Sequence, residues 1–294
     1  MANPIPAAPH WQDGVVPTPT GDVPRVATRL VPRDRLGHWR VRWGIGRMRH
    51  GVEPGLYAAG APDAGSPVLV TANFKMSFDR LREQLDGRDA WILVLDTKAI
   101  NVWCAAGKGT FGTDELIRRV EAAGLAGIVE HRKLVLPQLG ATGVSAHQVR
   151  ERSGWRVVYG PVRAEELPAF LDAGMRATAE MRRVRFPLSR RVALVPVEAV
   201  QAARYLLVAA AALILLSGLG AGGYSLGGLR EAGPRSLLLL LSAFLAGVAV
   251  APALLPWLPG RAFSWKGAWT GLLAVLAVWA WGASRVLDHL RGQP

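Results

Sequence analysis

The sequence has a single cysteine, Cys104, among its 294 residues. A lone thiol excludes an internal disulfide, and it excludes a cysteine-ligated iron–sulfur cluster built from this chain alone. The first residues, MANPIPAAPHWQDG, also lack the basic and continuous apolar regions of a secretory signal. We therefore expect the N-terminal part of the chain to stay in the cytoplasm.

Charge is missing from three long stretches in the last third of the chain, residues 205–229, 236–260 and 267–284. Each stretch is about as long as the ~20 apolar residues that a bilayer span needs. A surface helix of a soluble protein would normally show a polar face. We therefore predict a membrane domain over residues 204–294, with about three transmembrane helices at 205–223, 236–256 and 267–284.

Positive charge gathers just before the first of these runs. Seven arginines lie between Arg176 and Arg204, against only Glu180 and Glu198. Because Lys and Arg remain cytoplasmic beside membrane spans, we predict a multi-pass protein of the cytoplasmic (inner) membrane. Arg285 and Arg291 at the C-terminal end fall on the wrong side if there are three spans, so the number of spans stays open.

The net charge of +13 does not indicate nucleic-acid binding. The densest basic cluster lies beside the predicted membrane domain, where anionic lipid head groups account for it. Zinc-finger spacings, a basic zipper and an RNA-binding signature are all missing from the sequence. Membrane lipid is therefore the expected partner of this charge, and no nucleic acid is expected.

The preceding residues divide into two parts. Residues 1–53 are predicted to be a Pro-rich arm followed by an irregular lead-in, because VVPTPTGDVPR resembles a linker. Residues 54–200 alternate apolar strand patterns with helical ones. The strand patterns are Ser66–Asn73, Ala90–Ile100, Lys133–Leu136 and Trp155–Gly160. This alternation predicts an α/β domain with a Rossmann-like parallel sheet, and Thr113 and Ser145 are expected to cap two of its helices.

Ligands of open α/β sheets bind at the carboxyl ends of the strands. Thr71 and the segments 101–108, 137–144 and 159–163 all follow predicted strands, so we expect them to meet at one edge. Cys104 lies in this set, although a free cysteine is commonly a small buried hydrophobe. Lys108 follows four residues later, about one helical turn on, so we expect its positive charge to lie near the thiol.

Two other motifs near Cys104 are incomplete. The segment Gly107-Lys108-Gly109-Thr110 lacks the first glycine of the phosphate-binding loop pattern. A Cys104–His131 hydrolase pair lacks an evident third group. Neither motif predicts a site by itself.

The residues Asn101 to Lys108, NVWCAAGK, resemble the cap-helix signature of the mercury-methylating corrinoid protein family (HgcA), Asn-(Val/Ile)-Trp-Cys-Ala-(Ala/Gly)-Gly-Lys, at all eight positions. The segments VLVTANFKMSFD, LPQLGATGVSAHQV and YGPVRAEELPAFLDAGM are also similar to this family. They are similar as well to the corrinoid-binding domain of the corrinoid iron–sulfur protein large subunit, a family that lacks the cap cysteine and the membrane spans. The resemblance covers roughly residues 54–200, and the family's membrane domain usually has more spans than the three expected here.

This resemblance implies a corrinoid (cobalamin) bound in its base-off form, with Cys104 as the lower axial ligand of cobalt. A thiolate is a strong donor, and it favours release of the opposite methyl group with its bonding pair, which Hg(II) can accept. Asn101 and Trp103 would hold the cap helix and pack near the corrin. The implied cofactor-binding residues are Thr71, Asn101, Val102, Trp103, Cys104, Ala105, Gly107, Lys108, Gly140, Thr142, Gly143, Val144, Tyr159 and Gly160. His131 and His147 are not assigned to cobalt, and Arg163 borders the same edge.

The expected function is therefore corrinoid-dependent methyl transfer to inorganic Hg(II), which gives methylmercury. It requires a methyl-donor methyltransferase system and a separate two-cluster 4Fe–4S ferredoxin (HgcB-like), because this chain has no cluster with which to reduce cobalt again. One alternative is a corrinoid methyl carrier of one-carbon metabolism. The other is a membrane-anchored protein that holds a soft metal through Cys104, although closed metal sites usually gather three or four ligands.

Overall fold

The computed structural model describes residues 8–220 and 222–291, with side chains described up to residue 280. The chain divides into two compact units: residues 1–41 and 45–184 belong to the first, and residues 42–44 and 185–294 belong to the second. The predicted division at residues 200–204 therefore lies inside the second unit. The arginine-rich segment is shared, because Arg176, Arg182 and Arg183 belong to the first unit and the arginines from Arg185 onward to the second.

The first unit is built on a seven-stranded sheet with the order β1-β2-β3-β5-β4-β6-β7. Strands β5, β4, β6 and β7 are parallel to one another, whereas β3 is antiparallel to β5 and β1 is antiparallel to β2. The strands are β1 Gln12–Thr18, β2 Gly21–Val26, β3 Gly55–Ala59, β4 Val68–Ala72, β5 Ala90–Leu95, β6 Lys133–Leu136 and β7 Arg156–Tyr159. The predicted parallel core is confirmed, within a sheet that is mixed as a whole.

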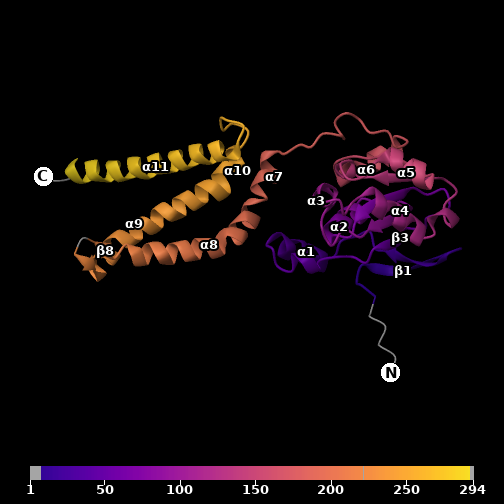
Figure 1. Ribbon diagram of the computed structural model, residues 1–294, viewed down its shortest axis with the longest axis horizontal. Helices are drawn as coiled ribbons and strands as arrows, with labels where there is room; N and C mark the ends of the chain where they lie inside the picture. The colour runs from indigo at the N-terminus through magenta and orange to yellow at the C-terminus, as the bar shows by residue number, and fades with distance from the viewer. Residues whose placement is uncertain (1–7, 221, 292–294) are drawn as a thin grey trace, which may run out of the picture. The chain divides into compact units, whose positions relative to one another are not determined.

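Helices cover both faces of the sheet (Figure 1). One face packs against α4 through Leu116 and Val120 and against α5 through Val149. The other packs against α2 through Phe78, against Leu85 just after the end of α2, and against α6 through Phe170. Every residue of β4 and β5 is buried, which explains why both strands are apolar almost throughout. The helices are α2 Lys75–Glu83, α3 Val102–Gly107, α4 Thr113–Ala122, α5 Ala146–Ser153 and α6 Leu167–Asp172, with short 3-10 turns η2 Leu125–Gly127, η3 Gln138–Gly140 and η4 Ala164–Glu166.

The first 53 residues are more ordered than their composition suggests. Strands β1 and β2 form a hairpin joined to β3, and α1 Pro32–Arg42 and the 3-10 turn η1 Arg47–Arg49 follow. Residues 12–26, predicted to be part of a Pro-rich, linker-like arm, form this hairpin, and Trp11, Val23 and Val26 are buried in the cores.

The two predicted helix caps have different outcomes. Ser145 caps α5, as expected, and its hydroxyl accepts a hydrogen bond from the Gln148 N–H. Thr113 does not cap α4, because Gly112 occupies the N-cap position. The Thr113 hydroxyl instead accepts a hydrogen bond from the Ser145 N–H at 2.9 Å, and this bond joins the starts of α4 and α5.

Five charged or titratable residues on α1 and α2 form a buried ion cluster: Asp34, His38, Lys75, Asp79 and Arg82. Lys75 Nζ lies 2.9 Å from Asp34 Oδ1 and 2.5 Å from Asp79 Oδ1. The Arg82 guanidinium donates to both carboxylates, at 2.8 and 2.7 Å. Burial alone would raise the pKa of Asp34 and Asp79, but hydrogen bonds to their neighbours (chiefly Lys75 for Asp34, and His38 and Lys75 for Asp79) outweigh it and hold each pKa below its usual value.

The second unit consists mainly of long apolar helices, α8 Val195–Leu216, α9 Leu226–Leu245 and α11 Phe263–Arg291. The remaining elements are α7 Leu188–Val192, the π-helical turn η5 Ala246–Val250, α10 Ala251–Leu254 and the short strand pair β8 Leu219–Gly220 and β9 Gly223–Tyr224. Among the described residues, 188–216 and 226–254 are long and apolar enough to cross a membrane. The predicted run 205–223 is interrupted after Leu216 by the β8–β9 turn, and the run 267–284 lies within α11.

Candidate functional site

The parallel strands reverse their order at one point, between β4 and β6. The chain passes from β4 outward to β5, and then returns across β4 to form β6 and β7. Such a reversal opens a crevice at the carboxyl ends of the two central strands, where open α/β sheets bind their ligands. The segments after β5 and β6 both belong to this edge, so the structure brings together the residues 101–108 and 137–144.

Helix α3 presents two different sides at this edge. Val102, Ala105 and Ala106 are buried in the core beneath the helix. The other side is exposed and carries Trp103, Cys104, Gly107 and Lys108. Cys104 and Lys108 are one helical turn apart, and the Cys104 thiol is free and open to solvent. The reading of Cys104 as a small buried hydrophobe is therefore wrong.

Asn101 explains why the helix begins where it does. Its side-chain oxygen accepts a hydrogen bond from the Cys104 N–H at 2.9 Å, which satisfies one of the free donors at the start of α3. The bond reaches the backbone of Cys104 and not its sulfur. Asn101 thus holds the residue that carries the thiol and leaves the thiol free to bind.

The glycines after β6 let the second loop lie directly against α3. A Cβ added at Gly143 would lie 2.2 Å from the Phe111 carbonyl oxygen and 2.9 Å from Ala106 Cα. One added at Gly140 would lie 2.6 Å from the Phe111 ring. Phe111 is fully buried, and it packs between the loop that follows α3 and the loop that follows β6. Sequence reasoning did not single out Phe111; an isolated aromatic residue inside the Gly-rich segment GKGTFG was the available signal.

The contact between Gly143 and α3 gives a prediction for stability. We expect Gly143→Ala to lower the free energy of unfolding by about 1–3 kcal/mol, because backbone atoms must move to admit the methyl group. Gly107→Ala is the matched control, since an added Cβ there meets nothing within 4 Å and alanine favours a helix. Thermal unfolding of the two variants measures the difference. Equal stabilities would contradict the close packing of this loop on α3.

The remaining predicted residues of this edge lie around the same loop. The Tyr159 hydroxyl, at the end of β7, donates a hydrogen bond to the Val144 carbonyl oxygen at 2.6 Å, and burial raises the Tyr159 pKa. The Gly160 N–H donates to the Leu136 carbonyl oxygen at 2.8 Å. Val144 and Gly160 are buried, whereas Thr142 is exposed at the tip of the loop. Tyr159, Val144 and Gly160 thus support the loop, and Thr142 is the predicted residue of this loop most open to a ligand.

Thr71 is the predicted residue that lies apart from this group. It pairs with Val94 in β5 and alternates with Val70 and Ala72. Val94 belongs to the core under α2, whereas Val70 and Ala72 belong to the core under α3. Thr71 is therefore on the face of the sheet that α2 covers, opposite to the face that packs against α3.

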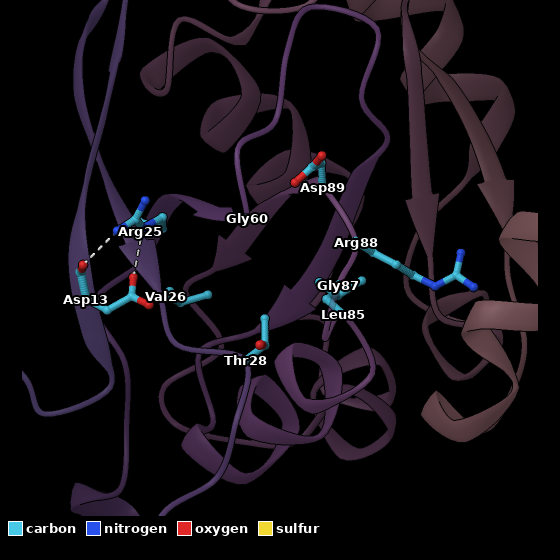
Figure 2. A pocket seen from close by; sticks show the side chains of 9 residues that line it. All are labelled: Asp13, Arg25, Val26, Thr28, Gly60, Leu85, Gly87, Arg88 and Asp89. Atoms are coloured by element: carbon cyan, nitrogen blue, oxygen red, sulfur yellow. Dashed lines mark hydrogen bonds and ion pairs between the residues drawn. The ribbon is translucent and has the colours of Figure 1, made fainter.

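Two further features lie at the opposite edge of the sheet. His131 precedes β6, and its Nε2 lies 2.9 Å from the Ser66 carbonyl oxygen just before β4, so it is not placed to pair with Cys104. A polar cavity of about 240 Å³ lies at the amino end of β5 (Figure 2). Its lining residues include Arg25, Gly60, Arg88 and Asp89, none of which belongs to the predicted site.

The carboxyl edge has features that suit a broad ligand with polar side groups. An added Cβ at Gly107 meets nothing, so the exposed side of α3 leaves room beside the thiol. Gln138, at the start of the loop after β6, has a buried side-chain oxygen without a hydrogen-bond partner among the described residues. Such an acceptor suits an N–H donor of a ligand, for example an amide. Gln138 carried no local signal, and the structure adds it to the candidate site.

In open α/β sheets, ligands bind at the carboxyl edge where the strand order reverses, and α3 lies at this edge here. Residues 46–171 match the family described as "CO dehydrogenase/acetyl-CoA synthase delta subunit". The chain is 37% identical to the acetyl-CoA decarbonylase/synthase complex subunit gamma of Methanopyrus kandleri over 123 residues, which are 41% of this chain and 26% of that protein. The subunit of the same name from Methanocaldococcus jannaschii is 34% identical over 129 residues, 42% of this chain and 26% of its own length.

The similarity therefore concerns one domain. The chain spans about a quarter of the length of these relatives, and the matched residues lie in the first unit, which contains β3 to β7 and α2 to α6. The helices of the second unit lie outside the match.

Proposed function

We propose that the first unit binds a corrinoid at the exposed side of α3 and takes part in corrinoid-dependent methyl transfer. Three observations support the proposal. The matched family and the relatives belong to acetyl-CoA synthase systems, whose chemistry includes a methyl group. The loops of the switch point meet at α3, and the buried Gln138 oxygen beside them lacks a donor. The observation that carries the proposal is the free thiol of Cys104 on the exposed side of a capped helix at this edge.

A bound corrinoid would supply the cobalt that carries the methyl group and exchanges it with an acceptor. The chain's own residues would do the rest. The Cys104 thiolate would be the side chain that holds the cobalt, and Asn101 would hold the backbone of Cys104 in place. Gly107 would keep the exposed side of α3 accessible to the ligand. Gly143 would let the loop after β6 pack closely against the other side of α3. Gln138 and Thr142 would accept or donate hydrogen bonds at the rim.

The proposal has two forms, which differ in the molecule that accepts the methyl group. The relatives favour a corrinoid methyl carrier that works within a larger complex, with other proteins as donor and acceptor. The exposed cysteine favours methyl transfer to Hg(II), because a thiolate donor is what the mercury-methylating resemblance requires and soft metals bind thiolates. In that case a low-potential ferredoxin and a methyl-donor enzyme would be needed as partners.

The helices of residues 188–216 and 226–254 support a location at the cytoplasmic membrane. Their length and composition allow each to cross a bilayer. The arginines between Arg176 and Arg204 would then keep the first unit on the cytoplasmic side.

The test is to purify the full chain without oxygen and to measure cobalt content and corrin absorbance. We expect stoichiometric cobalt and a corrin spectrum that survives gel filtration. Gln138→Leu should weaken retention of the corrinoid, since it removes the unpaired acceptor. Gln148→Leu, an exposed position on α5, is the matched control and should leave retention unchanged. A chain that takes up no corrinoid from an excess would reject the proposal.

A further inference from the structure

Helix α1 has one side buried in the first unit and one side exposed. The inward side carries Asp34, His38 and Val41, all of them buried. Asp34 Oδ2 lies 2.8 Å from Arg82 Nη2, and His38 Nε2 lies 2.8 Å from Asp79 Oδ2. These ion-pair contacts to α2 fix the rotation of α1, and so they fix which side of the helix is presented to the surroundings.

The outward side of α1 is apolar. Leu36 is 61% exposed and Trp39 is 54% exposed, and they lie three residues apart, which places them on one side of a helix. The exposed apolar surface continues past the end of α1, where Ile45 is 50% exposed and Met48 is 69% exposed. A helix that turns its polar residues inward and its apolar residues outward is the reverse of an ordinary surface helix. We call this surface the α1 ridge: Leu36, Trp39, Ile45 and Met48.

Positive charge borders the α1 ridge. At 3.6 residues per turn, Arg33 and Arg40 lie along one flank of the helix, while Arg35 lies along the other. Arg47 and Arg49 stand beside Met48 in η1. The one acidic residue of the segment 31–50 is Asp34, which is buried against Lys75 and Arg82. The surface around the α1 ridge therefore presents arginines without an exposed carboxylate of the same segment.

We propose that the α1 ridge docks into the interface of an anionic phospholipid bilayer. Apolar and Trp side chains favour the boundary between head groups and acyl chains. Arginines on both flanks match lipid phosphates, which they can bind in bidentate fashion. A neutral apolar protein partner would not account for five bordering arginines. The proposal does not depend on the corrinoid.

The test uses the full chain in lipid nanodiscs. A Met48→Cys, Cys104→Ala variant is labelled at residue 48 with the environment-sensitive fluorophore NBD, because Met48 is the most exposed apolar residue of the α1 ridge. The discs contain phosphatidylcholine alone or with phosphatidylglycerol, and a share of lipid carries a nitroxide quencher near the head group. We expect blue-shifted emission and strong lipid quenching in anionic discs, with weaker quenching in neutral discs or at high salt. A label at Gln148→Cys, exposed on α5, should show neither effect.

Two variants test separately how charge and apolar contact contribute to docking on the lipid. The reversal Arg33→Glu with Arg40→Glu should lower the ratio of docked to undocked protein at least about tenfold. The same charge change at exposed positions elsewhere, Arg150→Glu with Arg156→Glu, is the control and should leave the ratio near its original value. Leu36→Ser with Ile45→Ser should also reduce quenching, and both side chains are exposed, so the fold should tolerate the change.

Three outcomes would overturn the proposal. The first is an aqueous emission spectrum in both kinds of disc. The second is quenching that does not respond to lipid charge or to reversal of Arg33 and Arg40. The third is blue-shifted emission without lipid quenching, which would mean that protein and not lipid covers the α1 ridge.

Discussion

Asp79→Ala is expected to destabilise the first unit by about 3–5 kcal/mol, because it leaves the buried cations Lys75 and Arg82 with a single carboxylate, Asp34, between them. The Asp79 side chain is completely buried and receives hydrogen bonds from Lys75, Arg82 and His38. Because the pKa of Asp79 is lowered, its carboxyl is ionised at neutral pH, and the substitution removes a negative charge. Thermal unfolding followed by tryptophan fluorescence should show a melting temperature lower by roughly 10 °C.

The control for this prediction is Asp114→Ala, which also removes a carboxylate from an ion pair. Asp114 pairs with Arg152 on the surface, and its side chain is 87% exposed. Exposed pairs contribute about 1 kcal/mol or less, so this variant should unfold close to the original temperature. If both variants unfolded alike, the buried ion cluster would not be what holds α1 to α2.

The buried ion cluster also explains which parts of the fold the sequence could predict. Strands β4, β5, β6 and β7 are short apolar runs, and this local pattern was sufficient to place them. Helix α1 carries Asp34 and His38 on its buried side and Leu36 on its exposed side. Its hydrophobic pattern would therefore have predicted the opposite side to be buried. The partners that make burial tolerable, Lys75, Asp79 and Arg82, lie more than 40 residues later, and no local window contains both halves.

The site shows the same division between local and distant information. The start of α3 at Asn101 is a local property, and the strand pattern before residues 101–108 predicted that Cys104 follows β5 at the carboxyl edge of the sheet, which is where it lies in the structure. The close approach of Gly143 to Phe111 and Ala106 joins segments separated by about 30 residues, so only the fold displays it. Thr71 was grouped with this edge because it ends a strand. Alternation within β4 nevertheless puts it on the face of α2.

Cys104→Ala is expected to separate the two functions proposed for the corrinoid. If the thiolate is the lower ligand of cobalt, methylmercury formation by cells or by the purified system should fall by about 100-fold or more, since changes to groups that only surround a metal ligand already cost up to that factor. Corrinoid should remain bound but with a shifted absorbance spectrum. The fold should also remain intact, because Asn101 bonds to the backbone of residue 104 and alanine keeps that bond.

Asn101→Ala provides the matched comparison, because it keeps the sulfur and removes the cap. We expect it to cost about 0.5–2 kcal/mol of stability, and to reduce methyl transfer through a loosened α3 and not through a lost ligand. Its corrinoid spectrum should therefore keep the position found for the original chain. Undiminished methylmercury formation by Cys104→Ala would reject the thiolate ligand. It would leave the proposed carrier function in place, since the family match over residues 46–171 does not depend on this one side chain.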